Sequence, residues 1–348
     1  MYSSVEEVAA SALKVVVDAS DQSNNKTKQR RSKHNNKHSN STYSKLTTRQ
    51  KSITRGRDPI ISLNMNLDYL AKSGQKDACL RAEQMLMRIE ALHKDGYYEK
   101  SPDVISYNSV INAYAQSGIK GGGFKDPSVH AERLMSQMVD KGLKPNTITY
   151  NTLLRCILKE VESKQSKQYV EKKIDQAEGI IAIMEKKGLA NTISYNTVIS
   201  IISKSNLQDA AERAELWLQH MKELYVSTSN IKIQPDACSF NSVIHAHSNS
   251  NNLNNNSSPT QGAKRAEQLL SEMISLHRSG KYENVKPDVV SYSAVVNAYA
   301  RAAKAGRGSE QCADRAMEIL DKMVEVYEDG DVNVKPNKMT YTAVRLFN

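Results

Sequence analysis

The segment Thr147–Leu154, which reads TITYNTLL, decides the fold of this 348-residue chain. Its Thr-Tyr-Asn triplet at 149–151 has six altered copies along the sequence. They are Ser-Leu-Asn at 62–64, Ser-Tyr-Asn at 106–108 and 194–196, Ser-Phe-Asn at 239–241, Ser-Tyr-Ser at 291–293 and Thr-Tyr-Thr at 340–342. The central residues of successive copies lie 44, 43, 45, 45, 52 and 49 residues apart. Repetition at such a period predicts a stacked array of structural units rather than a globule around one core.

Each unit contains two amphipathic helical patterns. In the first, the aromatic residue is followed by apolar residues three, four and seven positions later, as in Tyr107, Val110, Ile111 and Tyr114. In the second, an alanine such as Ala131 opens the same spacing, and all six copies follow it. This periodicity predicts helices that bury one face, and prolines followed by Asp or Asn separate most units. The expected fold class is therefore all-α, a solenoid of helix–turn–helix repeats.

The helix breakers divide the chain into segments. We expect residues 1–57 to be a disordered basic segment. One interpretation of this segment is a targeting region. Six repeats follow at 58–103, 104–146, 147–191, 192–236, 237–288 and 289–337. Residues 338–348 then form the first helix of an incomplete seventh repeat, so the chain can be a fragment of a longer protein.

The charge distribution and the cysteine spacing bear on which ligands the chain can be expected to bind. The net charge is +10, and residues 21–57 alone contribute +10, with eleven Lys or Arg against one acid. Residues 58–348 carry only +2, so bulk charge gives little support for nucleic-acid binding by the repeats. The four cysteines lack metal-like spacing, and we expect neither a metal nor a cofactor. No apolar run is long enough to span a membrane.

One face of each first helix carries a repeating stripe. We number positions from the residue that follows the aromatic anchor. At 100° per residue, the residue three positions before it, this residue itself and the residue eight positions after it lie within about 80° of arc on the helix. The first position holds Ile61, Ile105, Ile148, Ile193, Cys238 and Val290. The second holds Asn64, Asn108, Asn151, Asn196, Asn241 and Ser293. The third holds Lys72, Gln116, Lys159, Lys204, Asn249 and Arg301. A stacked base needs the same groups: an apolar surface, a donor or acceptor for its edge, and a cation for its phosphate.

A structural interpretation of this stripe stands beside the functional one. An Asn near a helix start often bonds to local backbone, and a helical Lys is usually solvated. Five Asn in six units, all in the same register, favour the functional interpretation.

These residues resemble the pentatricopeptide repeat family, and residues 58–348 resemble its P-type arrays. TITYNTLL at 147–154 and KGLKPN at 141–146 match the family signature closely. The resemblance implies a right-handed superhelix that reads one RNA base per repeat. The base-reading pairs carried over are Asn64 with Asp103, Asn108 with Asn146, Asn151 with Asn191, Asn196 with Asp236, Asn241 with Asp288, and Ser293 with Asn337. The family's pairing rules then imply the bases U, C or U, C or U, U, U and A.

By the same resemblance, the aliphatic residues of the stripe would sandwich bases, and Lys72, Lys159, Lys204 and Arg301 would face phosphates. The chain departs from the family pattern in three respects. Leu63 replaces the first aromatic anchor, Ala190 replaces a proline, and the units are longer than usual.

Three classes of function compete. The first is a sequence-specific binder of single-stranded RNA that acts in organellar RNA processing, stabilisation or translation, with other RNA-processing proteins as further partners. A mitochondrial or plastid location would fit it, with cytoplasm or nucleus as alternatives. The second is a protein–protein scaffold, which the near-neutral repeat body favours. The third, an enzyme, is not expected, because His245 and His247 lack the Glu and Pro-Cys-x-x-Cys of a zinc deaminase.

Overall fold

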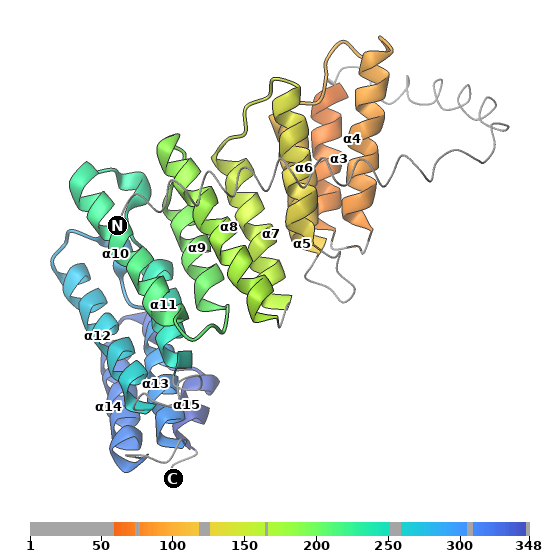
Figure 1. Ribbon diagram of the computed structural model, residues 1–348. Helices are drawn as coiled ribbons and strands as arrows, with labels where there is room; N and C mark the ends of the chain where they lie inside the picture. The colour runs from red at the N-terminus through yellow and green to blue at the C-terminus, as the bar shows by residue number, and fades with distance from the viewer. Residues whose placement is uncertain are drawn as a thin grey trace. The chain divides into compact units, whose positions relative to one another are not determined.

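The computed structural model describes residues 59–73, 75, 77–117, 126–163, 166–250, 259–304 and 309–345, and the expectations for residues 1–57 lie outside them. Within these residues all regular structure is helical, so the expected all-α fold is confirmed (Figure 1). The α-helices are α3 (Pro59–Lys72), α4 (Ala78–Lys94), α5 (Val104–Ser117), α6 (Pro127–Asp140), α7 (Thr147–Ser163), α8 (Lys167–Lys186), α9 (Thr192–Ser203), α10 (Ala210–Thr228), α11 (Ala237–Ser250), α12 (Pro259–Arg278), α13 (Val289–Lys304), α14 (Ser309–Glu328) and α15 (Lys338–Val344). Each predicted repeat contains one consecutive pair of them.

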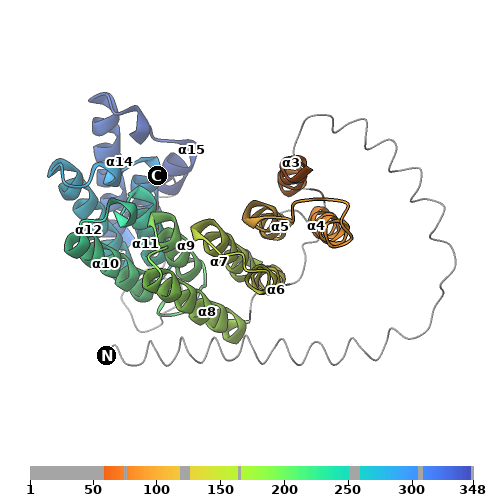
Figure 2. The same ribbon diagram turned by 90° about the horizontal axis from the view of Figure 1, so that it is seen from above.

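The chain divides into two compact units, Met1–Glu160 and Val161–Asn348, and the boundary in the sequence falls within α7. In the first unit, α5 packs against α3, α4 and α6. Figure 2 shows α3, α4 and α5 nearly end-on. The core between these helices contains Tyr107, Ile111, Tyr114, Leu134 and Met138, all at most 1% exposed. These are residues that the helical periodicity assigns to the buried faces.

In the second unit, α9, α11 and α13 lie in sequence, and each contacts the next. The second helices α10, α12 and α14 pack against them, and α10 and α12 also contact the first helix of the following repeat. Tyr195, Phe240, Met221 and Met273 are at most 1% exposed between the helices. The helix-hairpin stack is thus present in each unit, while the handedness of a superhelix stays a prediction.

The added length of the later repeats lies away from the first helices. Helices α10, α12 and α14 contain 19, 20 and 20 residues, against 14 in α6. A single 3-10 turn follows each of them: η1 (Ile231–Ile233), η2 (Glu283–Val285) and η3 (Val332–Val334). Each turn buries its last residue in the core. Helix α8 of an earlier repeat already has 20 residues, so what distinguishes the later repeats is the turn in the connection after the second helix, and the start of each first helix keeps its register.

A row of carboxylates on the second helices links neighbouring repeats, and we call Glu83, Glu178, Glu215 and Glu267 the carboxylate ladder. Three of them bond to both helices of the next repeat. Glu83 accepts from Tyr114 and Arg133, Glu215 from His247 and Arg265, and Glu267 from Tyr299 and Arg315. Glu178 instead accepts from Arg213 and Trp217, both of α10. Hydrogen bonds with a charged partner are stronger than neutral ones, so these contacts fix the packing of adjacent repeats.

Candidate functional site

The start of α11 shows how one predicted reading pair is built. The amide nitrogen of Asn196 donates to Oδ1 of Asp236 over 2.9 Å, although the two residues are 40 positions apart. The hydroxyl of Ser239 donates to Oδ1 of Asn196 over 2.6 Å. Asp236 also caps α11, because its Oδ1 accepts from the backbone N–H of Ser239 over 2.9 Å. A carboxylate oxygen only accepts, so the amide of Asn196 must turn its NH2 toward Asp236.

Three other predicted pairs have the same arrangement. The amide-to-cap distances are 3.2 Å for Asn64–Asp103, 3.3 Å for Asn108–Asn146 and 3.1 Å for Asn241–Asp288. The corresponding hydroxyl groups belong to Ser106, Thr149 and Ser291, at 2.6, 2.7 and 2.7 Å from the Asn oxygen. The structure therefore brings these residues together, and the Asn bonds to the residue that closes its own repeat and to a hydroxyl of the next one.

The two remaining pairs differ. Ser293 contacts the hydroxyl of Thr340 at 3.0 Å, and Thr340 in turn donates to Oδ1 of Asn337 over 3.1 Å. The shorter Ser side chain thus reaches its partner through a hydroxyl bridge. Asn151 and Asn191 lie in different compact units, so their pairing stays a prediction. Asn191 does cap α9 through a 3.0 Å bond from the backbone of Ser194.

Hydrogen-bonding capacity remains at each of the Asp-containing pairs. Oδ1 of Asp236 accepts from the amide of Asn196 and from the backbone N–H of Ser239, and it lies 3.0 Å from the Ser239 hydroxyl. Among the described residues, Oδ2 of Asp236 accepts none of the side-chain bonds that hold the pair, and Asn196 uses one of its two amide protons. Both side chains are half-buried. Each such pair can therefore offer one acceptor and one donor side by side to a ligand.

The aliphatic positions of the stripe are exposed to solvent. Ile61, Ile105, Ile148, Ile193 and Val290 are 55, 60, 61, 59 and 53% exposed, and Cys238 is exposed as well. Partial desolvation by the surrounding protein raises the pKa of the Cys238 thiol although its side chain is exposed, and Asp236 and Asp288 raise it further, so this position is uncharged at neutral pH. Single exposed aliphatic residues are common, but one at the same position of every repeat is a surface suited to an apolar ligand.

Met339 is a further exposed apolar residue at the first position of the stripe, and it was not predicted from the sequence. It lies three residues before Thr342 in α15 and is 71% exposed. Met339 could have been found from the sequence, because in every other repeat the stripe residue also lies three positions before the third residue of the triplet.

Most of the cations that were predicted to face phosphates form contacts with other side chains of the protein. Lys72 forms an ion pair with Asp68 and Lys204 with Glu162, both at 2.7 Å. Arg301 instead contacts the neutral Asn249 and the carbonyl of Ser248, and Lys159 is half-buried. Arg301 therefore keeps its net positive charge, whereas the charges of Lys72 and Lys204 are offset.

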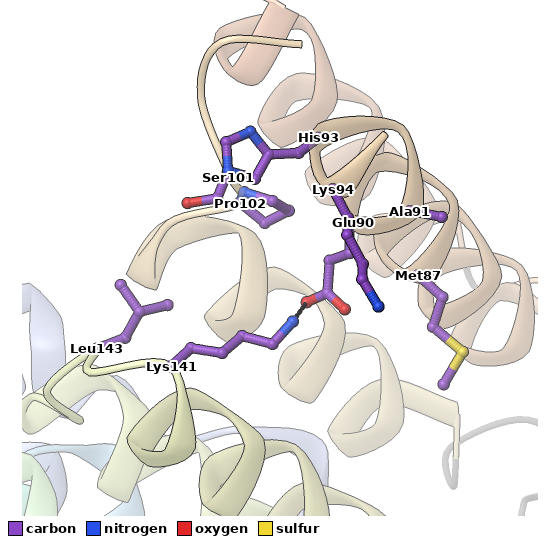
Figure 3. A pocket seen from close by; sticks show the side chains of 9 residues that line it. All are labelled: Met87, Glu90, Ala91, His93, Lys94, Ser101, Pro102, Lys141 and Leu143. Carbon is purple, nitrogen blue, oxygen red and sulfur yellow. Dashed lines mark ion pairs between the residues drawn. The ribbon is translucent and has the colours of Figure 1, made fainter. Parts of the chain in front are cut away.

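A hollow of about 550 Å³ lies elsewhere, at the end of α4 (Figure 3). Met87, Pro102 and Leu143 line it together with Glu90 and Lys141, which form an ion pair at 2.5 Å across one side. None of the stripe residues faces it. Within the part of the chain that the structure describes, no three His, Cys, Asp or Glu side chains gather as a metal site requires. None of the described helices is both long and apolar enough to cross a membrane.

Two family models of one repeat type match the middle of the chain. The PPR repeat family model matches residues 102–159, and the pentatricopeptide repeat domain model matches residues 133–205. A chloroplastic pentatricopeptide repeat-containing protein of Arabidopsis thaliana is 26% identical over 113 residues, 32% of this chain and 12% of that protein. A mitochondrial one from the same plant is 27% identical over 175 residues, 49% of this chain and 34% of that protein.

A ribosomal protein and a solved structure are also similar to this chain. The small ribosomal subunit protein mL103 of Arabidopsis thaliana is 28% identical over 152 residues, 43% of this chain and 30% of that protein. The matched stretches thus span between 12% and 34% of the length of these curated relatives. The crystal structure of the pentatricopeptide repeat protein PPR10 in complex with an 18-nucleotide psaJ RNA element aligns with 88% of this chain and 40% of its own. Its sequence identity is 17% and the TM-score is 0.43.

Proposed function

This chain is a pentatricopeptide repeat protein, and from that premise we propose that it binds single-stranded RNA in a sequence-specific way, one base per repeat. The single observation that carries the proposal is the set of four hydrogen-bonded reading pairs, one in each of four repeats, together with the exposed stripe residues of those repeats. Such a site combines an apolar surface for a base with a polar edge that distinguishes one base from another.

The Asp-containing pairs suit uracil. The Watson–Crick edge of uracil presents an N–H donor next to a carbonyl acceptor. Asp236 offers an acceptor in Oδ2, and Asn196 offers its second amide proton, so the two edges complement one another. The pairs Asn64–Asp103 and Asn241–Asp288 have the same groups and should select U as well.

The Asn108–Asn146 pair suits cytosine better than the Asp-containing pairs do. The backbone N–H of Thr149 donates to Oδ1 of Asn146 over 3.1 Å, which turns the amide NH2 of Asn146 away from the helix. Asn108 also presents an amide proton. Two donors side by side match the two acceptors of the cytosine edge, its ring nitrogen and its carbonyl oxygen.

We take the six predicted reading pairs as the RNA site, in the order U, C or U, C or U, U, U and A. Ile61, Ile105, Ile148, Ile193, Cys238 and Val290 would sandwich the bases. Arg301 is the strongest candidate for a phosphate contact, followed by Lys159, Lys72 and Lys204. The role is binding, without bond-breaking, in the processing, stabilisation or translation of a transcript. The chloroplastic and mitochondrial relatives support an organelle as its compartment.

The test measures the affinity of the full chain for labelled UCCUUA and for a scrambled RNA of the same composition, by fluorescence anisotropy at physiological salt. Tighter binding of UCCUUA supports the proposal. Equal binding of both would mean that charge alone attracts RNA, as the basic residues 21–57 can do, and the proposal would fail. Recovery of protein partners after nuclease treatment, with no RNA affinity, would support a scaffold instead.

A further inference from the structure

A buried hydroxyl stands beside every predicted reading pair. Ser or Thr occupies the third position of α5, α7, α9, α11, α13 and α15. The six residues are Ser106, Thr149, Ser194, Ser239, Ser291 and Thr340, and each is 0% exposed. None of them can touch an RNA directly, so any effect on base recognition has to pass through a neighbouring side chain.

Helix capping accounts for only part of this pattern. In the cap of α11, the backbone N–H of Ser239 donates to Asp236, and the backbone N–H of Asp236 donates to the oxygen of Ser239 over 3.1 Å. A Glu or Gln at this third position commonly serves such a cap equally well. The cap uses the hydroxyl only as an acceptor, so the hydroxyl proton is left for another partner.

That proton goes across the repeat boundary. The Ser239 oxygen is 2.6 Å from Oδ1 of Asn196 and 3.0 Å from Oδ1 of Asp236. Thr149 is 2.7 Å from Oδ1 of Asn108 and 3.2 Å from Oδ1 of Asn146. Ser106 and Ser291 show the same order, with the Asn oxygen nearer in both. A hydroxyl has one proton, and the shorter contact takes it.

From this geometry we infer that the buried hydroxyls are positioning residues that set the base selectivity of the preceding repeat. Ser106, Thr149, Ser239 and Ser291 each hold the oxygen of a reading Asn, and thereby keep its amide NH2 next to the cap residue with one proton directed outward. The inference rests on the proposed RNA-binding function and adds a determinant that never touches the base. Ser and Thr are interchangeable for this purpose, as their alternation among the six positions indicates.

The test compares three variants of the full chain at one repeat. Ser239→Ala removes the hydroxyl that holds Asn196, and Ser239→Thr retains it. Ser242→Ala is the matched control, because Ser242 lies in the same helix and its hydroxyl contacts Ser200 at 3.2 Å instead of a reading pair. Affinities are measured for UCCUUA and for RNAs with C at the fourth or at the fifth base.

Ser239→Ala is expected to reduce the U-over-C preference at the fourth base about fivefold, equivalent to one neutral hydrogen bond of about 1 kcal/mol. The preference at the fifth base, which Asn241 and Asp288 would read, should not change. Ser239→Thr and Ser242→Ala should keep both preferences.

The readout separates a positioning role from a structural one, because destabilisation alone lowers the affinity for all three RNAs equally. An unchanged fourth-base preference in Ser239→Ala, with the wild type selective, overturns the inference and leaves the proposed function standing. A wild type without any base preference overturns both.

Discussion

Arg265 of α12 forms a forked ion pair with Glu215 of α10, and its Nε lies 3.1 Å from each carboxylate oxygen. The same carboxylate accepts from His247 of α11 over 2.8 Å, so a single side chain joins three helices of two repeats. Burial on its own raises the pKa of Glu215, but the bonds from Arg265 and His247 outweigh it and hold the pKa below its usual value.

Replacing this carboxylate should destabilise the second unit. Glu215→Gln keeps the shape of the side chain but removes the charge that Arg265 and His247 engage. The free energy of unfolding should fall by about 1–3 kcal/mol, measured by urea denaturation with circular dichroism. The control Glu318→Gln removes an exposed pair with Arg315 within α14 and should cost less than about 0.5 kcal/mol. Equal losses in the two variants would contradict a special role for the ladder.

His247 should make stability depend on pH. Burial lowers its pKa in the folded protein more than Glu215 raises it, while the unfolded chain keeps a value of about 6.5. Below pH 6.5 the unfolded state therefore binds more protons, and stability should fall as pH falls through this value. His247→Tyr should show a smaller decrease in melting temperature between pH 7.5 and 5.5, because Tyr does not titrate there.

Tyrosine is a fair substitute at position 247. Tyr114 and Tyr299 occupy the same register and donate to Glu83 and Glu267 of the ladder. The other histidines are common to both proteins, so the difference between the two melting curves isolates His247. Parallel pH profiles would show that His247 titrates alike in the folded and unfolded states.

Asp236→Asn should change the base preferred at the fourth position from U toward C. The substitution exchanges the free acceptor Oδ2 for a donor, as at the Asn108–Asn146 pair. The cap of α11 should survive, because Asn already caps α9 and α15. Affinities for UCCUUA and UCCCUA would be compared, with Asp331→Asn as a control outside the reading pairs. A retained preference for U would argue against edge recognition by this pair.

Ile105→Ala should weaken RNA binding without affecting stability. The side chain is 60% exposed, so its truncation should change the free energy of unfolding by less than about 0.5 kcal/mol. Loss of an apolar surface for a base should lower affinity about fivefold, at the low end of measured stacking contributions. Val139→Ala, at 57% exposure in the second helix α6, is the matched control and should leave affinity unchanged. Equal affinities of the two variants would remove the aliphatic stripe from the proposed site.

Arg301→Gln should reduce affinity for every RNA sequence by the same factor. Its guanidinium contacts neutral partners, so it retains the charge to attract a phosphate. The slope of log affinity against log salt should become shallower by about 0.7, the value for one contact to a single strand. Lys72→Gln should alter the slope less, because Asp68 already neutralises this lysine. A larger change for Lys72 would mean that RNA displaces its ion pair.

The periodic part of the fold could be predicted from the sequence. The anchors at Tyr107 and Tyr195 and the alanines that open the second helices repeat with one spacing, and the structure buries them as that spacing requires. The exposure of the aliphatic stripe also follows from helix geometry, because these residues lie opposite the buried face.

The side-chain contacts between neighbouring repeats could not be predicted from the sequence periodicity. That Asn196 would meet Asp236 was implied by family resemblance, but the hydroxyl of Ser239 between them was not anticipated. Sequence periodicity gives the direction of a side chain on its own helix, and it does not give the distance to the next helix. For the same reason the ion pair of Lys204 with Glu162 was missed, whereas Asp68 and Lys72 lie four residues apart on one helix and their ion pair could have been predicted.

The carboxylate ladder has a consequence for how such a protein changes in evolution. Three of its four members bond to both helices of the following repeat, so side chains within the helices set the distance from one repeat to the next. The connecting segments are then free to lengthen or shorten, as the spacings of 43 to 52 residues between anchors show. A new loop could be inserted between two helices, and the packing of adjacent repeats would stay the same.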